Sequence, residues 1–132
     1  MGPARQGSGM SDLRIEVAGR TLSAAWTDEC PETRAAIEAA LPLAGEATRW
    51  GDELYFRTDV DAPPENARAP VPEGALAYWP QGSAVCLFWG PTPASEGTEP
   101  RAASPVSVFA QVVDASALSD LSGGATVEIT QS

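Results

Sequence analysis

The chain has 132 residues, the length of one domain, and 43% of them are hydrophobic, which is enough to form a core. Eighteen Asp and Glu residues against eight basic residues, all of them Arg, give a formal net charge of −10, and the chain contains no His. This acidity argues against binding to nucleic acid or to anionic lipid, because both need basic surfaces. Without His, the chain cannot form a Ser-His-Asp or Cys-His catalytic system or an imidazole-ligated metal site.

The acidic surplus in a chain without Lys has two explanations. Concentrated salt screens charge repulsion, so a protein of a high-salt cytoplasm can carry a large negative charge that keeps it soluble. A genome rich in G and C also favours Ala, Gly, Pro and Arg over Lys. We favour adaptation to high salt. A cytoplasmic location is expected, because no apolar run reaches the roughly 18 residues of a membrane span and the N-terminal segment has no apolar signal core.

The first part of the chain predicts a tail, a hairpin and a helix. Residues 1–11 are polar and rich in Gly, so we expect them to be disordered. Residues 13–17 alternate apolar and charged side chains as a half-buried strand does, Ala18-Gly19 supplies a reversal, and residues 21–26 form the returning strand. A helix is then expected over Pro31–Leu41, because Pro is favoured at the first helical position.

The rest of the domain, which we place at residues 12–132, has the pattern of short strands separated by Gly and Pro. Two Pro-rich connections, Asp59–Pro72 and Pro91–Pro105, have a length typical of functional or mobile loops, and residues 116–121 predict a short helical turn. The pattern predicts a mainly β fold, a small closed or nearly closed β-barrel of about eight strands with one early α-helix. After the helix, the expected strands are 47–50, 53–58, 75–79, 84–89, 106–113 and 125–130.

The two cysteines, Cys30 and Cys86, are expected to be buried free thiols. Cys86 lies in an apolar run, where free Cys behaves as a small hydrophobic residue. Cys30 comes directly before the expected helix, a position that can lower a thiol pKa. A reactive Cys30 and a disulfide between the two residues are therefore the alternatives.

Two acidic clusters are candidate chemical sites. Adjacent residues of a strand point to opposite faces, so Asp52 and Glu53 do not form a pair of catalytic carboxylates, and we expect them to be surface charges or partners of an Arg. Asp59, Asp61 and Glu65 offer oxygen ligands on a loop, but their spacing matches no Ca²⁺-binding loop. We therefore predict no metal site, no cofactor and no catalytic residues.

Three stretches carry a family resemblance, namely Arg49–Phe56, Gly74–Pro93 and Ala103–Phe109. Together they resemble the small cyclophilin-like fold family of archaeal and bacterial proteins, whose members are mostly uncharacterised. The resemblance spans about residues 12–130, and its middle stretch, GALAYWPQGSAVCLFWGPTP, is long and unusual. It implies a compact eight-stranded barrel of the cyclophilin type with helical caps, in agreement with the expected number of strands.

The same resemblance indicates what is missing. Cyclophilins isomerise X-Pro bonds with an Arg that assists the rotation and with Phe, Trp and His around the proline ring. This chain has no His, and aligning residues 84–88 with the strand that carries the pocket Phe puts Cys86 at that place. Arg49 and Arg57 flank the region, but neither maps onto the catalytic Arg. The fold is expected to carry over without the isomerase site.

We therefore predict a non-catalytic module that binds a small molecule or a peptide. Ligand pockets are typically apolar with a few polar groups, so we place the site in an aromatic groove formed by Trp50, Tyr55, Trp79 and Phe88, with Arg49 as the polar anchor. The alternative for these aromatic residues is that they all serve packing. A weak or divergent peptidyl-prolyl isomerase and a subunit of a larger enzyme assembly are the other functions left open, as are the ligand and the oligomeric state.

Overall fold

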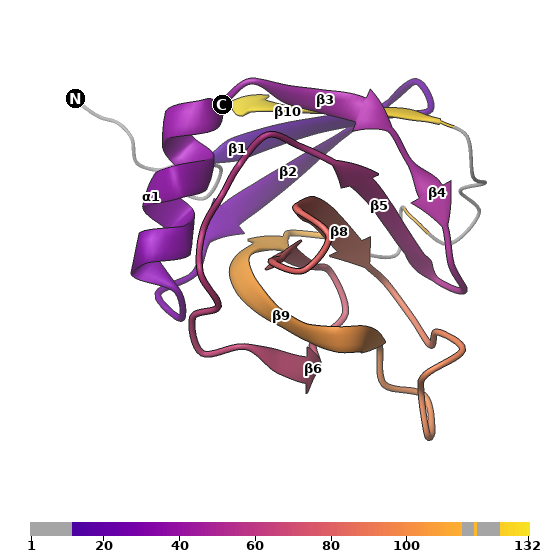
Figure 1. Cartoon of the computed structure of the whole chain (residues 1–132). Coiled ribbons are helices and arrows are strands. Elements are labelled where there is room, and N and C mark those ends of the chain that lie inside the picture. The colour runs from indigo at the N-terminus through magenta and orange to yellow at the C-terminus, as the bar shows by residue number, and fades with distance from the viewer. Residues whose placement is uncertain (1–11, 115–117, 119–124) are drawn as a thin grey trace.

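The computed structural model describes residues 12–114, 118 and 125–132, and this part of the chain contains ten β-strands and one α-helix (Figure 1). In chain order the elements are β1 (Leu13–Val17), β2 (Arg20–Trp26), α1 (Pro31–Ala40), β3 (Leu43–Glu46), β4 (Thr48–Arg49), β5 (Glu53–Arg57), β6 (Arg68–Pro70), β7 (Ala75–Trp79), β8 (Ala84–Phe88), β9 (Arg101–Val112) and β10 (Thr126–Gln131). The predicted tail 1–11 lies outside the described residues, and so does the helical turn predicted at 116–121 except for Leu118, which is buried. No helix in the described ranges has the length and apolar character needed to cross a bilayer.

Antiparallel pairing joins the strands into one curled sheet in the order β3-β10-β1-β2-β9-β7-β8-β5-β4, with β6 paired to β9. The two edge strands, β3 and β4, are consecutive in the chain and are joined by Ala47 alone. Among the described residues no hydrogen-bonded ladder joins these edges. Instead Phe56 of β5 packs against Gly45 of β3, where a Cβ atom would lie 2.9 Å from ring atom Cδ2. The predicted mainly β fold is confirmed, whereas the described residues form ten strands instead of about eight, in a sheet that their hydrogen bonds do not close.

The first hairpin forms as predicted. Val17 of β1 pairs with Arg20 of β2, which leaves Ala18 and Gly19 as a two-residue turn. Both turn residues have positive φ, 52° for Ala18 and 79° for Gly19. This is the geometry of the turns whose twist matches the twist of the paired strands, and Gly19 adopts it without steric cost.

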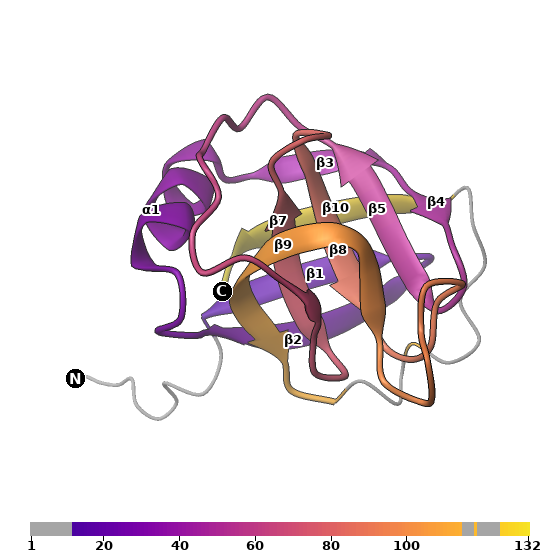
Figure 2. The ribbon, with the colours of Figure 1, turned by 60° about the horizontal axis from the view of Figure 1, so that its bottom comes forward.

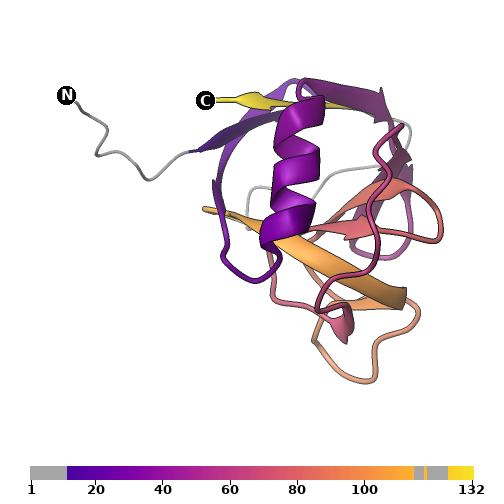
Figure 3. The same ribbon diagram turned by 60° about the vertical axis from the view of Figure 1, so that its left-hand side comes forward.

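The helix α1 begins at Pro31, as predicted, and ends at Ala40, one residue before the predicted end. Thr33 and Ile37, four residues apart, are its buried side chains and lie on one face. Figure 3 shows the helix lying across one opening of the curled sheet. The buried face of α1 therefore closes that end of the core.

The N-terminus of α1 is capped from a distant loop. Cys30, at the capping position, makes no side-chain cap bond. Glu65 takes this role, because its Oε1 accepts hydrogen bonds from the backbone N–H and the hydroxyl of Thr33 at 2.8 and 3.0 Å, and its Oε2 accepts one from the N–H of Glu32 at 3.2 Å. The hydrogen bond from the Thr33 backbone is the main cause that lowers the pKa of Glu65. Glu65, one of the loop carboxylates considered above as metal ligands, therefore accepts hydrogen bonds from N–H groups that have no partner within the helix.

Both cysteines are buried and free, as expected. Burial raises the pKa of Cys30 to about 11, and the charges of Glu29 and Glu65 add to this effect. The Cys30 thiol donates a hydrogen bond to the carbonyl oxygen of Glu65 at 3.0 Å. Burial and two nearby carboxylates outweigh the helix N-terminus, which argues against the alternative of a reactive Cys30.

The central strands β5, β8 and β7 bury both of their faces. Alternate residues belong to two different apolar clusters, as the period of two in a strand requires. Tyr78 and Trp79 accordingly point to opposite faces, and so do Phe88 and Trp89, as predicted. The inner face contributes Leu54, Phe56, Leu76, Tyr78, Val85 and Leu87 to the main core. The outer face carries Tyr55, Ala75, Ala77, Trp79, Cys86 and Phe88.

The outer face of these strands is covered by β9, which bends over it (Figure 2). The last part of β9 pairs with β7 and β2, with a register shift opposite Leu76 and Ala77. The first part leaves β7 and pairs with β6 at Val106 and Arg101. The predicted loop Pro91–Pro105 therefore ends at residue 100, directly before β9 begins. The other predicted loop, Asp59–Pro72, contains β6. Neither β6 nor the first part of β9 was predicted, because their sequences, RAP and RAASP, combine small residues with Pro, which disfavours a strand.

Candidate functional site

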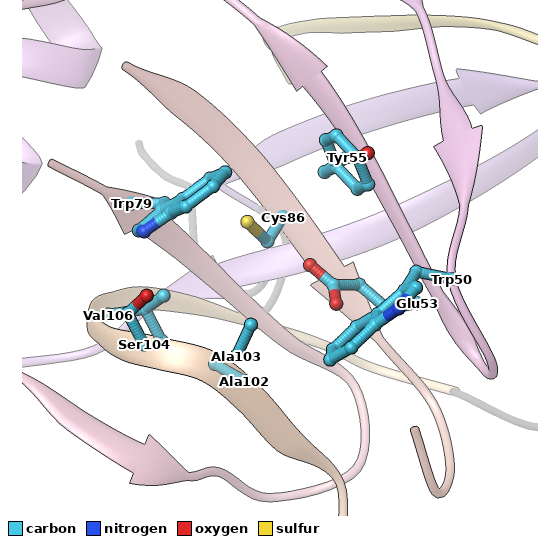
Figure 4. Close-up of a pocket in the computed structure, with 9 residues that line it drawn as sticks. All are labelled: Trp50, Glu53, Tyr55, Trp79, Cys86, Ala102, Ala103, Ser104 and Val106. Carbon is cyan, nitrogen blue, oxygen red and sulfur yellow. The ribbon is translucent and has the colours of Figure 1, made fainter. Parts of the chain in front are cut away.

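A cavity of about 240 Å³ lies between the outer face of the central strands and the first half of β9. Its lining is mainly apolar and aromatic, with one carboxyl group. The lining residues are Trp50, Glu53, Tyr55, Trp79, Cys86, Ala102, Ala103, Ser104 and Val106 (Figure 4). A concave site with an apolar lining and a small number of polar groups is the usual form of a small-ligand site.

The strand β5 supplies two of the lining residues through its alternation. Glu53 and Tyr55 are two residues apart and share the outer face, whereas Leu54 between them belongs to the inner core. On the neighbouring strand, Cys86 is the register partner of both Tyr55 and Ala77. Cys86 therefore forms the floor of the cavity at the centre of a three-stranded surface.

Two aromatic rings form a corner of the cavity. The centroids of the Tyr55 and Trp79 rings are 6.4 Å apart, and their planes make an angle of 85°. The ring of Trp79 packs closely against Gly82, where a Cβ atom would lie 2.5 Å from ring atom Cε3. The indole N–H of Trp79 is buried and has no hydrogen-bond partner among the described residues. The contact between the two rings and the contact of Trp79 with Gly82 hold the corner in place before any ligand arrives.

The third ring, that of Trp50, comes from the turn between β4 and β5. The backbone N–H of Trp50 donates a hydrogen bond to the carbonyl oxygen of Glu53 at 2.8 Å, which closes the turn. Gly51 in this turn has φ of 62°, and a Cβ atom there would lie 2.7 Å from the Cα of Thr92. The turn therefore requires Gly at residue 51, and it places Trp50 beside Glu53 (Figure 4).

The carboxyl group of Glu53 is the acidic side chain among the residues that line this cavity. The residue is 5% exposed, and Figure 4 shows its carboxyl group directed into the space in front of Cys86. Burial raises the pKa of Glu53 from 4.5 to about 7, and a hydrogen bond with Cys86 opposes this rise. Near neutral pH the cavity therefore contains both the protonated and the ionised form of this group.

Cys86 stays protonated next to this carboxyl group. Burial is the main cause that raises the pKa of its thiol well above the ordinary value, and the charge of Glu53 adds to it. The thiol is therefore the donor in the hydrogen bond to Glu53. At this position Cys86 contributes a weak donor and not a nucleophile.

The structure brings three of the five predicted site residues together. Trp50, Tyr55 and Trp79 line the cavity, whereas Arg49 and Phe88 do not. Phe88 is completely buried in the outer apolar cluster. The Arg49 guanidinium donates hydrogen bonds to the Gly51 carbonyl oxygen at 2.7 Å and to Asp52 at 2.8 Å, and it lies 5.4 Å from the centroid of the Trp89 ring.

Sequence reasoning missed Glu53, Cys86 and the lining residues of β9. The prediction for Asp52 holds, because it pairs with Arg49, but the prediction of a surface position for Glu53 is wrong. A signal for Glu53 was present, since alternation from Tyr55 places it on the same face. The first half of β9 gave no such signal, because its contribution depends on the bend that folds it over the sheet.

Comparisons with known proteins agree with this architecture. The model of a family described as cyclophilin-like matches residues 11–130. A hypothetical protein from Archaeoglobus fulgidus, solved in solution, is 36% identical with a TM-score of 0.74 and covers 100% of both chains. McbB, solved in complex with tryptophan, is 15% identical with a TM-score of 0.70, covering 89% of this chain and 44% of McbB. No protein with curated annotation matches the chain.

Proposed function

This chain belongs to the cyclophilin-like family, and we propose that it is a non-catalytic binding protein that holds a small organic molecule, or an apolar side chain of a peptide, in the cavity between β5, β8 and β9. One observation carries the proposal. Three aromatic side chains and one buried carboxyl group converge on the same cavity, and each comes from a strand or a tight turn that fixes its position. Such preorganisation lowers the entropy cost of binding.

The non-catalytic part of the proposal rests on the arginines. A peptidyl-prolyl isomerase needs a donor directed at the twisting amide, and Arg49 and Arg57 were the candidates. Arg49 is engaged with Asp52, and Arg57 donates a hydrogen bond to the carbonyl oxygen of Gly82 at 3.1 Å. Neither residue lines the cavity. We expect only the background rate in a protease-coupled assay on a proline-containing tetrapeptide, whereas a faster rate that is lost in Arg49→Ala or Arg57→Ala would favour the isomerase.

The likeness to McbB suggests one probe. McbB was solved in complex with tryptophan, but at 15% identity the likeness concerns the fold alone. Tryptophan is therefore one member of a test panel, together with choline, benzyl alcohol and a proline-containing peptide. The four members represent an amino acid, an organic cation, a neutral aromatic compound and a peptide.

The four tryptophans of the chain provide an internal control for this test. Trp50 and Trp79 line the cavity, whereas Trp26 and Trp89 do not. In an NMR titration we expect a ligand to move the indole N–H signals of Trp50 and Trp79 and to leave the other two in place. Ala103→Phe should fill the mouth of the cavity and abolish these shifts, and Ala35→Phe on the exposed side of α1 is the matched control. If no member of the panel moves the two signals, the proposed function is wrong.

A further inference from the structure

The cavity contains a buried carboxyl group that has no ion-pair partner among the described residues. Glu53 is 5% exposed, and within the described residues its carboxyl group takes part in no ion pair. None of the lining residues is basic, and the chain has no Lys or His that could serve as a counter-charge elsewhere. Buried carboxylates are nearly always paired with a cation or with strong hydrogen-bond donors. Here the thiol of Cys86 is the donor in contact with Glu53, and it is a weak one.

The rings around this carboxyl group favour a cation as well. The face of an aromatic ring is negative, so Trp and Tyr attract organic cations, and several such rings together form the cages that bind alkylated ammonium groups. Trp50, Tyr55 and Trp79 surround the space in front of Cys86, into which the Glu53 carboxyl group is directed (Figure 4). Tyr55 and Trp79 meet at 85°, so they form two walls of a corner and do not stack on one another.

Other classes of ligand match these groups less well. An anion would be repelled by Glu53 and by the net charge of −10, and no Arg lines the cavity to hold it. A bare metal ion needs several oxygen or sulfur ligands, and the described part of the chain has no group of three or more that could supply them. A neutral aromatic compound would cover the Glu53 carboxylate without pairing it, which would add to the cost of burial.

We infer, building on the proposed function, that the ligand is an organic cation whose alkylated ammonium group lies between the rings of Trp50, Tyr55 and Trp79 and against the carboxylate of Glu53. The rings supply the contact with the alkyl groups, and Glu53 supplies the charge. Such a group is large and weakly hydrated, so it loses little solvation on entering an apolar cavity.

Two probes of equal shape test this inference on the unmodified protein. Choline carries a trimethylammonium group, and 3,3-dimethylbutan-1-ol replaces its nitrogen by an uncharged carbon. Both are titrated at one fixed salt concentration and at about pH 8, where Glu53 is mostly ionised. We expect choline to bind at least about tenfold more tightly than the alcohol, with shifts of the Trp50 and Trp79 indole signals.

Two variants then assign the charge effect. Glu53→Gln keeps the shape of the side chain and should lower the affinity for choline about tenfold while leaving the affinity for the alcohol unchanged. Glu16→Gln removes the same charge from an exposed position of β1 and should change neither affinity. The contrast between the two variants separates contact with Glu53 from the general acidity of the protein.

The outcomes distinguish this inference from the proposed function. If the alcohol binds as tightly as choline, or if choline does not bind while tryptophan, benzyl alcohol or the peptide moves the Trp50 and Trp79 signals, the cation inference is overturned and the binding function stands. If no compound of any class moves these signals, both are overturned. Because the comparison of the two probes needs no variant, its result does not depend on whether Glu53→Gln folds.

Discussion

The ring of Trp79 occupies the space that a side chain at Gly82 would need, since a Cβ atom there would lie 2.5 Å from Cε3 and 2.6 Å from Cζ3 of the indole. The two residues belong to the β7–β8 hairpin, so the turn that connects the strands also supports one wall of the cavity. Gly82 is therefore required because the Trp79 ring leaves no room for a Cβ atom. Its backbone does not require Gly, since its φ is not positive.

Gly82→Ala should therefore displace Trp79 and destabilise the protein. Forcing an extra methyl group against a fixed ring typically costs about 1–3 kcal/mol. We expect a loss of this size in urea denaturation, together with a shifted indole signal of Trp79. Gly97→Ala is the control, because a Cβ atom there meets only the end of the Glu99 side chain at 3.2 Å. Equal stability of the two variants would contradict the supporting role of Gly82.

Glu53 should make the stability of the protein fall as pH rises. Its pKa is about 7 in the folded chain against an ordinary value of 4.5, so the folded state binds this proton more tightly than the unfolded state. The stabilisation by the protonated form is complete below pH 4.5 and is lost as pH rises to about 7, a change of about 3 kcal/mol. Glu53→Gln should remove this dependence, as measured by urea denaturation across that range. Glu16→Gln should keep it, and parallel curves for wild type and Glu53→Gln would contradict the assignment.

The local patterns of the sequence predicted the elements that depend on neighbouring residues. The hairpin turn at Ala18 and Gly19, the helix start at Pro31 and the opposite orientation of Tyr78 and Trp79 all follow from rules that act over a few residues. These rules also placed Trp50, Tyr55 and Trp79 in the candidate site.

The remaining features depend on contacts between distant segments. Arg49 was expected in the site because it precedes Trp50, but it is the register partner of Leu54, whose side chain lies on the inner face. Paired residues of neighbouring strands share a face, so Arg49 lies on the face of the sheet opposite to Tyr55. The cavity in front of Glu53 likewise depends on the bend of β9, which a sequence of Ala, Ser and Pro does not indicate. A sequence pattern predicts which face a residue occupies, but not what covers that face.

The stability of the protein should depend on Glu65, a loop residue that caps the N-terminus of α1 from more than 30 positions away in the chain. Glu65→Ala removes the acceptor of three hydrogen bonds at the start of the helix, so its melting temperature should be lower than that of the wild type. The pKa of Glu65 is lowered, so its contribution is present above the ordinary value and is lost as pH falls through the folded value. Glu38→Ala, at an exposed position of the same helix, is the control. Equal melting temperatures for both variants would rule out the cap.

The net charge of −10 predicts a fold that depends on salt. At low ionic strength the carboxylates repel one another over a longer distance, whereas molar KCl shortens this distance to about 3 Å. We expect the far-UV circular dichroism of a β protein in molar KCl and its loss after desalting. A spectrum that does not change on desalting would favour the explanation by genome composition.

Binding of an organic cation should be linked to the ionisation of Glu53. Cys86 and Tyr55 are the other ionisable groups that line the cavity, and the pKa of Cys86 is raised, so its thiol does not become charged near neutral pH. Arg49 and Asp52, in the adjoining turn, pair with each other. The affinity for choline should therefore rise as pH increases towards about 7 and level off above it, because the ionised form of Glu53 binds the cation. Below this value, binding should release a proton, which calorimetry detects as a dependence of the binding heat on the buffer. A choline affinity independent of pH in the wild type, or a pH dependence that persists in Glu53→Gln, would show that another group holds the cation.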